Sequence, residues 1–375
     1  MSAGWGRPAA AILAALLMAA ALLLPAGAGP DGPLLWRDDA MTLLGVLLSA
    51  AGCLIVAASR RRPLVTGVAG LAGLLAGAVA PLAALGSGAE LGLAAAALWL
   101  QLAGLWLLAW LVLEDLSRAA RTLPPLGWLV PALFGAWLLF AWEVVVRGFG
   151  VPPVLLPAPS RIAVQLAAQA PTLLGDFRQT FLKSVLAGWA MGSAAGFVVA
   201  LLIDRVPFLQ RGLLPYGNLV SAVPIVGIAP IMVMWFGFDW QSKAAVIVVM
   251  TFFPMLINTL AGFAAADGMS RDLMRSYGAG YGQTFLKLRL PAALPFIFNA
   301  LKINSTLALI GAIVSEFFGS PIAGLGFRIS VEIGRMNVDV VWATIAVAAV
   351  AGSIFYGVLA LLERLLTFWH PSYRR

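Results

Sequence analysis

The sequence predicts an all-α integral membrane protein with about ten transmembrane helices. Of its 375 residues, 62% are hydrophobic and only 11% are charged, whereas about 25% are charged in an average soluble domain. So few charges cannot cover the surface of a soluble protein of this size. Because lipid offers no hydrogen-bond partner to a free backbone amide, helices are the expected membrane-spanning elements.

Ten apolar stretches each approach the roughly 20 residues that a spanning helix needs. They cover residues 9–25, 40–58, 64–86, 91–113, 126–146, 178–203, 213–236, 244–265, 291–317 and 340–363. The loops on the side that holds both chain ends carry fifteen Lys and Arg residues, against eight on the other side. The positive-inside rule therefore places both termini in the cytoplasm.

The first apolar stretch has two interpretations. Arg7, the apolar run and Ala26-Gly27-Ala28 fit a signal peptide with an A-x-A cleavage site. We favour an uncleaved first helix, and cleavage would leave the remaining topology unchanged.

The rare residue types exclude several kinds of chemistry. The chain has one cysteine, Cys53, and one histidine, His370, so it can form neither an internal disulfide nor a multi-histidine metal centre. None of its four lysines follows a glycine, so the Walker A sequence is absent. We expect no metal, no cofactor and no enzymatic activity in this chain. Because its net charge of +8 lies in short loops between apolar runs, membrane topology explains that charge better than nucleic-acid binding does.

The character of the chain changes near residue 122. Residues 1–121 hold four spans rich in Ala, Leu and Gly, to which the sequence assigns no role. Residues 126–375 have longer, polar, proline-marked loops. Two of these, 147–177 and 318–339, lie on the outer side, where they either contact an external partner or serve as solvated connectors.

The longest inner loop, residues 267–291, reads DGMSRDLMRSYGAGYGQTFLKLRLP. We expect Asp272 to begin a helix, since a carboxylate suits a helix N-terminus, with Leu273, Met274 and Tyr277 as its apolar edge. The glycines that follow predict an elbow before a second short helix. Such an element either docks into a groove on a soluble partner or lies on the membrane as an amphipathic helix.

This loop resembles the EAA loop of ABC importer permeases, whose pattern is E-A-A, three residues, Gly and, a dozen residues later, Leu-Pro. Gly278 and Leu290-Pro291 have the family spacing, whereas Asp272-Leu273-Met274 stands in place of E-A-A. Further segments resemble the nitrate/sulfonate/taurine branch of that family: 155–160, 223–230, 234–237, 252–259, 275–278, 324–326 and 362–373. The resemblance covers residues 126–375, and residues 1–121 have no counterpart in the usual six-span permease.

The resemblance implies a type I permease core of six spans in a bacterial inner membrane. It also implies a second permease subunit, usually another copy of the same chain, so that we expect a homodimer, and an extracytoplasmic solute-binding protein. Two cytosolic ATPase subunits would bind ATP and Mg. The EAA loop would be the coupling helix that contacts the ATPase, through Asp272, Arg275, Ser276, Tyr277, Gly278, Ala279, Gly282, Phe285, Leu290 and Pro291.

Candidates for the translocation pathway are the helix-breaking and polar residues of the later spans. Ser221, Pro224, Gly227 and Pro230 in the seventh span either line the pathway or kink a structural helix. Polar groups inside spans add Asn258, Lys302, Asn304 and Glu316, because such groups usually face a protein interior. Lys302 could instead extend towards the inner surface, and Glu316 could reach outer water.

Two other classes of protein compete with an ABC permease. An ion-coupled secondary transporter would show inverted repeats with paired broken helices, and the first half has no convincing partner for the broken seventh span. A membrane enzyme would gather His, Asp, Glu or Cys at one depth. The expected substrate is a small organic solute, either a sulfonate-, taurine- or nitrate-like anion or a pyrimidine- or riboflavin-type vitamin precursor.

Overall fold

A computed structural model describes residues 6–29, 32–58, 62–87, 91–123, 125–206 and 224–369. Ser221 and His370 lie outside these described residues. The chain forms two compact units, an N-terminal unit (Met1–Arg161) and a C-terminal unit (Ile162–Arg375). Helix α7 (Pro159–Ala168) carries the chain from one unit to the other.

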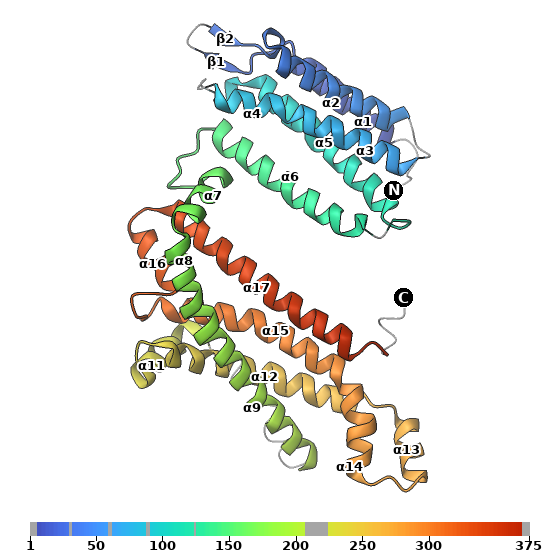
Figure 1. The fold of residues 1–375 in the computed structure, drawn as a ribbon, viewed down its shortest axis with the longest axis vertical. Coiled ribbons are helices and arrows are strands. Elements are labelled where there is room, and N and C mark those ends of the chain that lie inside the picture. The colour runs from blue at the N-terminus through green and yellow to red at the C-terminus, as the bar shows by residue number, and fades with distance from the viewer. Residues whose placement is uncertain are drawn as a thin grey trace. The chain divides into compact units, whose positions relative to one another are not determined.

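The N-terminal unit is a bundle of apolar helices (Figure 1). These helices are α1 (Gly6–Ala21), α2 (Ala40–Ala58), α3 (Pro63–Gly77), α4 (Val79–Gly86), α5 (Ala96–Ala119) and α6 (Leu126–Gly148), with short 3₁₀ turns η1 (Trp36–Asp38) and η2 (Gly92–Ala94). An antiparallel pair of three-residue strands, β1 (Gly27–Gly29) and β2 (Gly32–Leu34), follows α1. The sequence did not predict this pair, because its Gly-Ala-Gly and Gly-Pro-Leu segments lack residues that favour strands.

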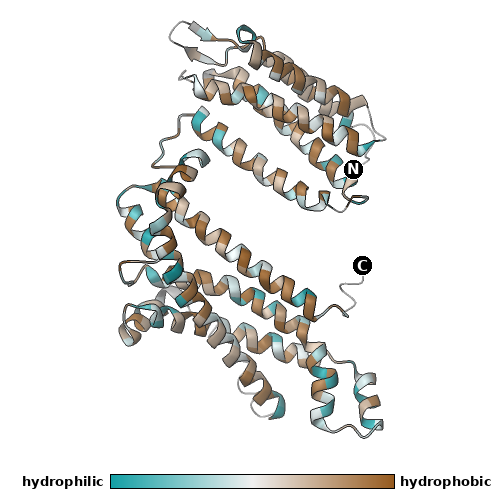
Figure 2. Cartoon of the chain, viewed as in Figure 1, coloured by the Kyte–Doolittle hydropathy of each residue, from teal (hydrophilic) through white to brown (hydrophobic). Residues whose placement is uncertain are grey.

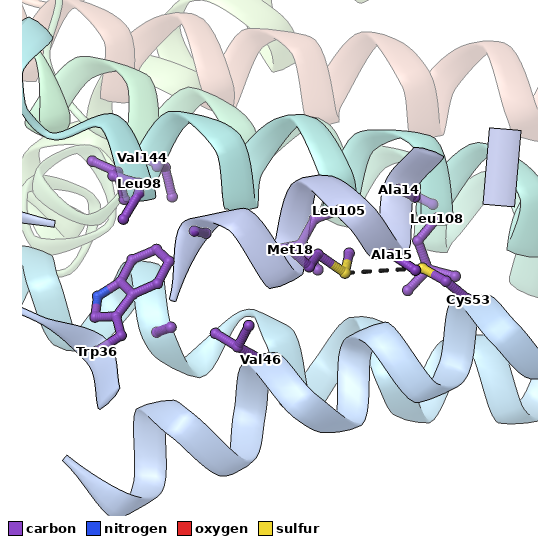
Figure 3. Close-up of a cluster of buried hydrophobic side chains, with 14 of the residues drawn as sticks. Ala14, Ala15, Met18, Trp36, Val46, Cys53, Leu98, Leu105, Leu108 and Val144 are labelled. Atoms are coloured by element: carbon purple, nitrogen blue, oxygen red, sulfur yellow. Dashed lines mark hydrogen bonds between the residues drawn. The ribbon is translucent and has the colours of Figure 1, made fainter. Parts of the chain in front are cut away.

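The core of this unit is built from close helix contacts and medium-sized side chains. A Cβ added to Gly52 of α2 would lie only 3.2 Å from the Cα of Gly73 in α3, so glycine lets these two backbones approach. Met18 and Cys53 meet at 3.9 Å between sulfur atoms, among Leu105 and Leu108 (Figure 3). Cys53 is therefore a buried packing residue.

A polar cluster joins three helices of the same unit. Asp115 of α5 is fully buried and forms an ion pair with Arg7 of α1. Thr66 of α3 donates its hydroxyl to the same carboxylate at 2.6 Å. A buried carboxylate needs such partners, so this cluster fixes the relative positions of α1, α3 and α5.

Helix α6 packs within the N-terminal unit. Trp137 of α6 is mostly buried, with its ring centroid 6.2 Å from that of Trp106 in α5. The sequence analysis assigned this span to a permease core that begins at residue 126. That boundary stays a prediction, since packing of a helix against its neighbours does not by itself assign it to a functional domain.

The C-terminal unit contains the longest helices. A continuous helical rod consists of α8 (Ala170–Phe177), the π-helical turn η3 (Arg178–Val185) and α9 (Leu186–Arg205). The other elements are α11 (Ile225–Phe236), α12 (Trp240–Ala264), α13 (Gly268–Ser276), α14 (Tyr281–Thr284), the π-helical turn η4 (Phe285–Arg289), α15 (Leu290–Glu316), α16 (Leu325–Gly334) and α17 (Val338–Leu366). Helices α14, η4 and α15 also form one uninterrupted rod.

Helices α9, α12 and α15 form the centre of the C-terminal unit. Gly188, Gly192 and Gly196, spaced four residues apart on α9, face α12. Asn304 of α15 is fully buried and donates to the Ser193 hydroxyl at 2.9 Å and to the Thr251 carbonyl at 2.8 Å. Small residues thus permit close approach, and one amide group links the three helices.

The glycine contact on α9 leads to a first prediction. A Cβ at Gly196 would lie 2.9 Å from Met255 Cβ and collide with the Phe252 carbonyl oxygen. Since the backbone of α12 cannot easily yield, we expect Gly196→Ala to lower stability by about 1–3 kcal/mol. Thermal unfolding in detergent measures this. The matched control is Gly357→Ala on α17, where nothing lies within 4 Å; an equal loss in both variants would contradict the packing explanation.

The predicted helical membrane fold is confirmed. Among the described residues, eight helices are long and apolar enough to cross a membrane. The other two expected spans correspond to shorter apolar helices, α1 of 16 residues and α11 of 12 residues. Hydrophobic residues follow the long helices, and hydrophilic ones gather around α13, α14 and α16 (Figure 2).

Candidate coupling segment and buried polar groups

Residues 267–291, the predicted coupling segment, form a helix, an elbow and a second helix, as the sequence predicts. Helix α13 begins at Gly268, and the Asp267 carboxylate accepts a hydrogen bond from the Ser270 N–H at 3.2 Å. The expectation that Asp272 begins the helix is wrong, because Asp272 lies in its middle and faces solvent beside Arg275. Asp267 is the residue whose extended backbone lets its side chain cap the first turn.

One exposed side of α13 is apolar. Met269, Leu273 and Tyr277 follow one another at four-residue spacing and are 81%, 56% and 81% exposed. Residues four apart share a helix face, so the three form one stripe, called here the α13 stripe. The sequence placed Met274 on this edge, but Met274 is only half-exposed. An exposed apolar stripe is typical of a contact with another molecule.

Gly278 forms the elbow after α13. Its φ of +69° lies in the left-handed region, where glycine avoids the steric cost that other residues incur. The Gly278 N–H donates to the Arg275 carbonyl at 2.9 Å, and the Ala279 N–H donates to the Met274 carbonyl at 2.9 Å. These bonds satisfy free carbonyls at the helix end and turn the chain sharply.

The remaining predicted coupling residues follow in order along the segment. Gly282 belongs to α14, and Phe285 begins η4, with its ring 5.2 Å from that of Phe263 in α12. Leu290 and Pro291 begin α15 directly after the π-helical turn η4, so the proline, which has no N–H to donate, lies where the regular α-helical hydrogen bonding is already interrupted. The segment is therefore attached to the membrane helices both by the chain and by aromatic packing.

The predicted pathway residues are spread over three helices. Pro224 precedes α11, which contains Gly227 and Pro230. Asn258 of α12 donates to the Pro254 carbonyl at 2.8 Å and accepts from Asn299 at 3.3 Å. Asn304 lies elsewhere, enclosed between α9, α12 and α15, and its pathway role stays a prediction, as do those of the other residues.

Lys302 of α15 is paired with a carboxylate of a neighbouring helix. Its ammonium group lies 2.6 Å from a carboxylate oxygen of Glu363 in α17, and both side chains are mostly buried. The Tyr356 ring centroid lies 6.0 Å from the same nitrogen. Sequence reasoning missed Glu363, although a carboxylate inside an apolar span needs a partner.

We predict that replacing one partner of this ion pair lowers stability much more than replacing both. Glu363→Ala leaves a buried ammonium group unpaired, which typically costs about 3–5 kcal/mol. Replacing both partners, Lys302→Met with Glu363→Leu, should be close to neutral. Thermal unfolding in detergent distinguishes these outcomes, with Arg37→Ala, in an exposed pair with Asp38, as the control. A double variant as unstable as the single one would contradict the prediction.

Glu316 is enclosed at the other end of α15. It is 2% exposed and accepts hydrogen bonds from the Thr180 hydroxyl and the Gly326 N–H, each at 2.7 Å. Thr180 in turn accepts from the Leu325 N–H at 2.7 Å. Glu316 therefore does not reach outer water. It binds η3 and the start of α16 to the end of α15.

Two neighbouring carboxylates extend this network. Asp176 of α8 accepts from the Gly324 N–H and from Arg328, each at 2.8 Å. Asp239, just before α12, accepts from the Gln179 amide at 2.7 Å and from the Trp240 N–H. These hydrogen bonds, that of Gln179 foremost, hold the pKa of the Asp239 carboxyl below its ordinary value. In the described part of the chain, no cluster of three or more His, Cys, Asp or Glu could hold a metal ion.

Comparison with known proteins identifies the family. Residues 192–368 match the family described as "binding-protein-dependent transport system inner membrane component". The chain is 31% identical over 244 residues to the formylaminopyrimidine transport permease protein of Halalkalibacterium halodurans, covering 65% of this chain and 97% of that protein. The chain belongs to the permease family of binding-protein-dependent ABC transporters.

Two further relatives agree with this membership. The riboflavin transport system permease protein of Chloroflexus aurantiacus is 29% identical over 236 residues, with 63% of this chain and 88% of the relative covered. The taurine transport system permease protein of Escherichia coli is 29% identical over 242 residues, with 63% and 87% covered. The permease is thus a multi-pass membrane transport subunit, which gives no support to an ion-coupled secondary transporter or a membrane enzyme.

Proposed function

We propose that this permease is the membrane subunit of an ATP-driven importer in a bacterial inner membrane, with both termini in the cytoplasm. It would form the translocation pathway with a second copy of itself and receive solute from an extracytoplasmic binding protein. A cytosolic ATPase dimer would bind ATP and Mg and contact residues 267–290. In this division of labour the permease alternates between two states as the ATPase opens and closes.

The α13 stripe carries this proposal. Met269 and Leu273 of the short helix α13, and Tyr277 directly after its last residue, are exposed, while the elbow at Gly278 and the rod that includes α15 hold the helix in place. A soluble partner with an apolar groove fits such a stripe. The sequence contains no Walker A motif, which supports our proposal that the partner is a separate chain that binds the ATP.

For the substrate we propose a small organic solute. The relatives are named for formylaminopyrimidine, riboflavin and taurine transport, which include flat heterocycles and a sulfonate anion. Trp235, Phe236 and Phe238 near the end of α11 are exposed and would suit a flat ring, although exposed aromatic residues also occur at membrane interfaces. The choice between the two chemical classes depends on the binding protein that delivers the solute.

Uptake into proteoliposomes tests the proposal. The permease is reconstituted with a candidate ABC ATPase from the same organism, and ATP and Mg are supplied on the ATPase side. Radiolabelled riboflavin, formylaminopyrimidine or taurine is offered with a candidate solute-binding protein from that organism. We expect uptake of one of these solutes that requires both ATP and the binding protein. Uptake driven by a proton or sodium gradient without ATP would refute the proposal.

A further inference from the structure

A cluster of charged and aromatic side chains joins the coupling segment to helix α9. The Arg289 guanidinium donates two hydrogen bonds to the Asp204 carboxylate, at 2.8 and 2.7 Å. The Tyr281 hydroxyl donates to the same carboxylate at 3.0 Å. Bidentate arginine–carboxylate pairs are stronger and more directional than single-bond pairs, and the Arg289 and Asp204 side chains are only 17% and 12% exposed.

The same arginine also holds the end of a third helix. Its Nε donates to the Phe263 carbonyl at 3.2 Å, and Phe263 lies in the last turn of α12, where carbonyls lack intrahelical partners. One guanidinium therefore links the inner ends of α9 and α12 to the start of α15. Around it, the Arg205 guanidinium lies 3.9 Å from the Tyr281 ring centroid.

The stability of α9 alone does not explain why an aspartate occupies position 204. Asp204 is the last residue but one of α9, where the helix dipole disfavours negative charge. Without Arg289 the carboxylate would weaken its own helix and lie largely desolvated. Its position is favourable only because the coupling segment supplies a cation and a hydroxyl.

The position of the pair connects the coupling segment to a further helix. The chain itself connects the segment to α15, because α14, η4 and α15 form one rod, and the Phe285–Phe263 contact connects it to α12. The Asp204–Arg289 pair connects it to α9. From α9 the chain continues through residues 207–223 to α11, which carries the predicted pathway residues Gly227 and Pro230.

We infer that Asp204 and Arg289 are positioning residues that transmit movement of the coupling segment to α9. The inference rests on the proposed function, since it assumes that an ATPase moves α13. Without the pair, ATP-driven movement would still enter α15 through the chain, but it would reach α9 only through the packing of α9 against α12 and α15. The pair should therefore matter for transmission more than for ATPase binding, whose contacts lie on the α13 stripe.

A reporter on α9 tests this inference. Leu202 is 57% exposed on α9, and the one native cysteine, Cys53, can be replaced by alanine. A Leu202→Cys variant labelled with an environment-sensitive fluorophore is assembled with the partner ATPase, and a non-hydrolysable ATP analogue with Mg is added. We expect a spectral response with the native pair. In Asp204→Ala and Arg289→Ala it should be at least about fivefold smaller, the lower end of common coupling factors.

Controls separate transmission from folding and binding. ATPase affinity and melting temperature are measured for every variant. Asp204→Glu keeps a carboxylate and should keep the response, so it tests the inference even if an alanine variant does not fold. The double alanine variant should lose no more than either single variant, because residues that act as a pair are non-additive. Asp38→Asn, at an exposed carboxylate of the N-terminal unit, should respond like the parent protein.

The possible results separate this inference from the proposed function. If no ATPase binds the unmodified permease, the proposed function is wrong and the inference falls with it. If the ATPase binds but the reporter does not respond, or responds equally in Asp204→Ala and Arg289→Ala, only the inference is overturned. A response that is lost in the alanine variants and restored by Asp204→Glu supports it.

Discussion

Leu273→Asp is expected to abolish most binding of the partner ATPase. Leu273 lies at the centre of the α13 stripe, between Met269 and Tyr277, and is 56% exposed in the permease alone. Central apolar anchors commonly contribute 2 kcal/mol or more to binding, which corresponds to about a 30-fold loss of affinity. A carboxylate in an apolar groove should cost at least as much, because it would be desolvated without a partner.

Titration of the detergent-solubilised permease with the purified ATPase measures this loss. Arg271→Gln is the matched control, since Arg271 is exposed on the opposite side of α13 and its replacement should leave the affinity within about threefold, as for most residues outside an interface centre. Leu273 is exposed, so the substitution should leave the melting temperature unchanged. Unchanged affinity in Leu273→Asp would contradict docking through the α13 stripe and would favour the alternative that its amphipathic pattern also allows, a helix on the membrane surface.

Sequence patterns could predict the spans because lipid imposes a simple requirement. About 20 apolar residues must follow one another, and this rule places helices such as α12 and α15 within a few residues of their observed ends. The helix–elbow–helix form of the coupling segment could also be predicted from a local signal, because Gly278 lies only two residues after the last residue of α13. The start of α13 was misplaced because Asp267 and Asp272 are both acceptable near a helix N-terminus, and backbone geometry selects the former.

The partners of the buried charges could not be predicted from local patterns. Lys302 pairs with Glu363 across 61 residues of sequence, and Asp204 pairs with Arg289 across 85. Asp176 pairs with Arg328 across 152 residues. Helical periodicity relates residues three or four apart and contains no information about such pairs. The sequence therefore indicated that Lys302 and Glu316 needed polar surroundings, but not which helices supply them.

Glu316→Ala is expected to destabilise the C-terminal unit strongly. It removes the acceptor of two buried hydrogen bonds, from the Thr180 hydroxyl and the Gly326 N–H. Each donor left behind is buried without a partner, which costs about 1–3 kcal/mol. The expected loss is thus about 2–6 kcal/mol, or a fall of roughly 4–24 °C in melting temperature for a unit of this size.

Two further variants test whether the loss of stability comes from the buried hydrogen bonds of Glu316. Glu316→Gln keeps the shape but presents an NH₂ group to one of the two donors, so it should lose about half as much. Arg335→Ala removes a charge whose side chain is 64% exposed, and its effect should stay below about 1 kcal/mol. Limited proteolysis should cut residues 318–324 faster in Glu316→Ala than in Arg335→Ala, because the network that holds the following turn is lost.

The same experiment decides between two roles for Glu316. If the carboxylate lines the pathway, its removal should alter transport while the melting temperature stays near that of the unmodified permease. If it fixes the outer segment, stability should fall first, and transport should fall only in proportion to the folded fraction. Its full enclosure and its bonds to η3 and to the start of α16 favour the second outcome, since a group that serves passing solute must be reachable from the pathway.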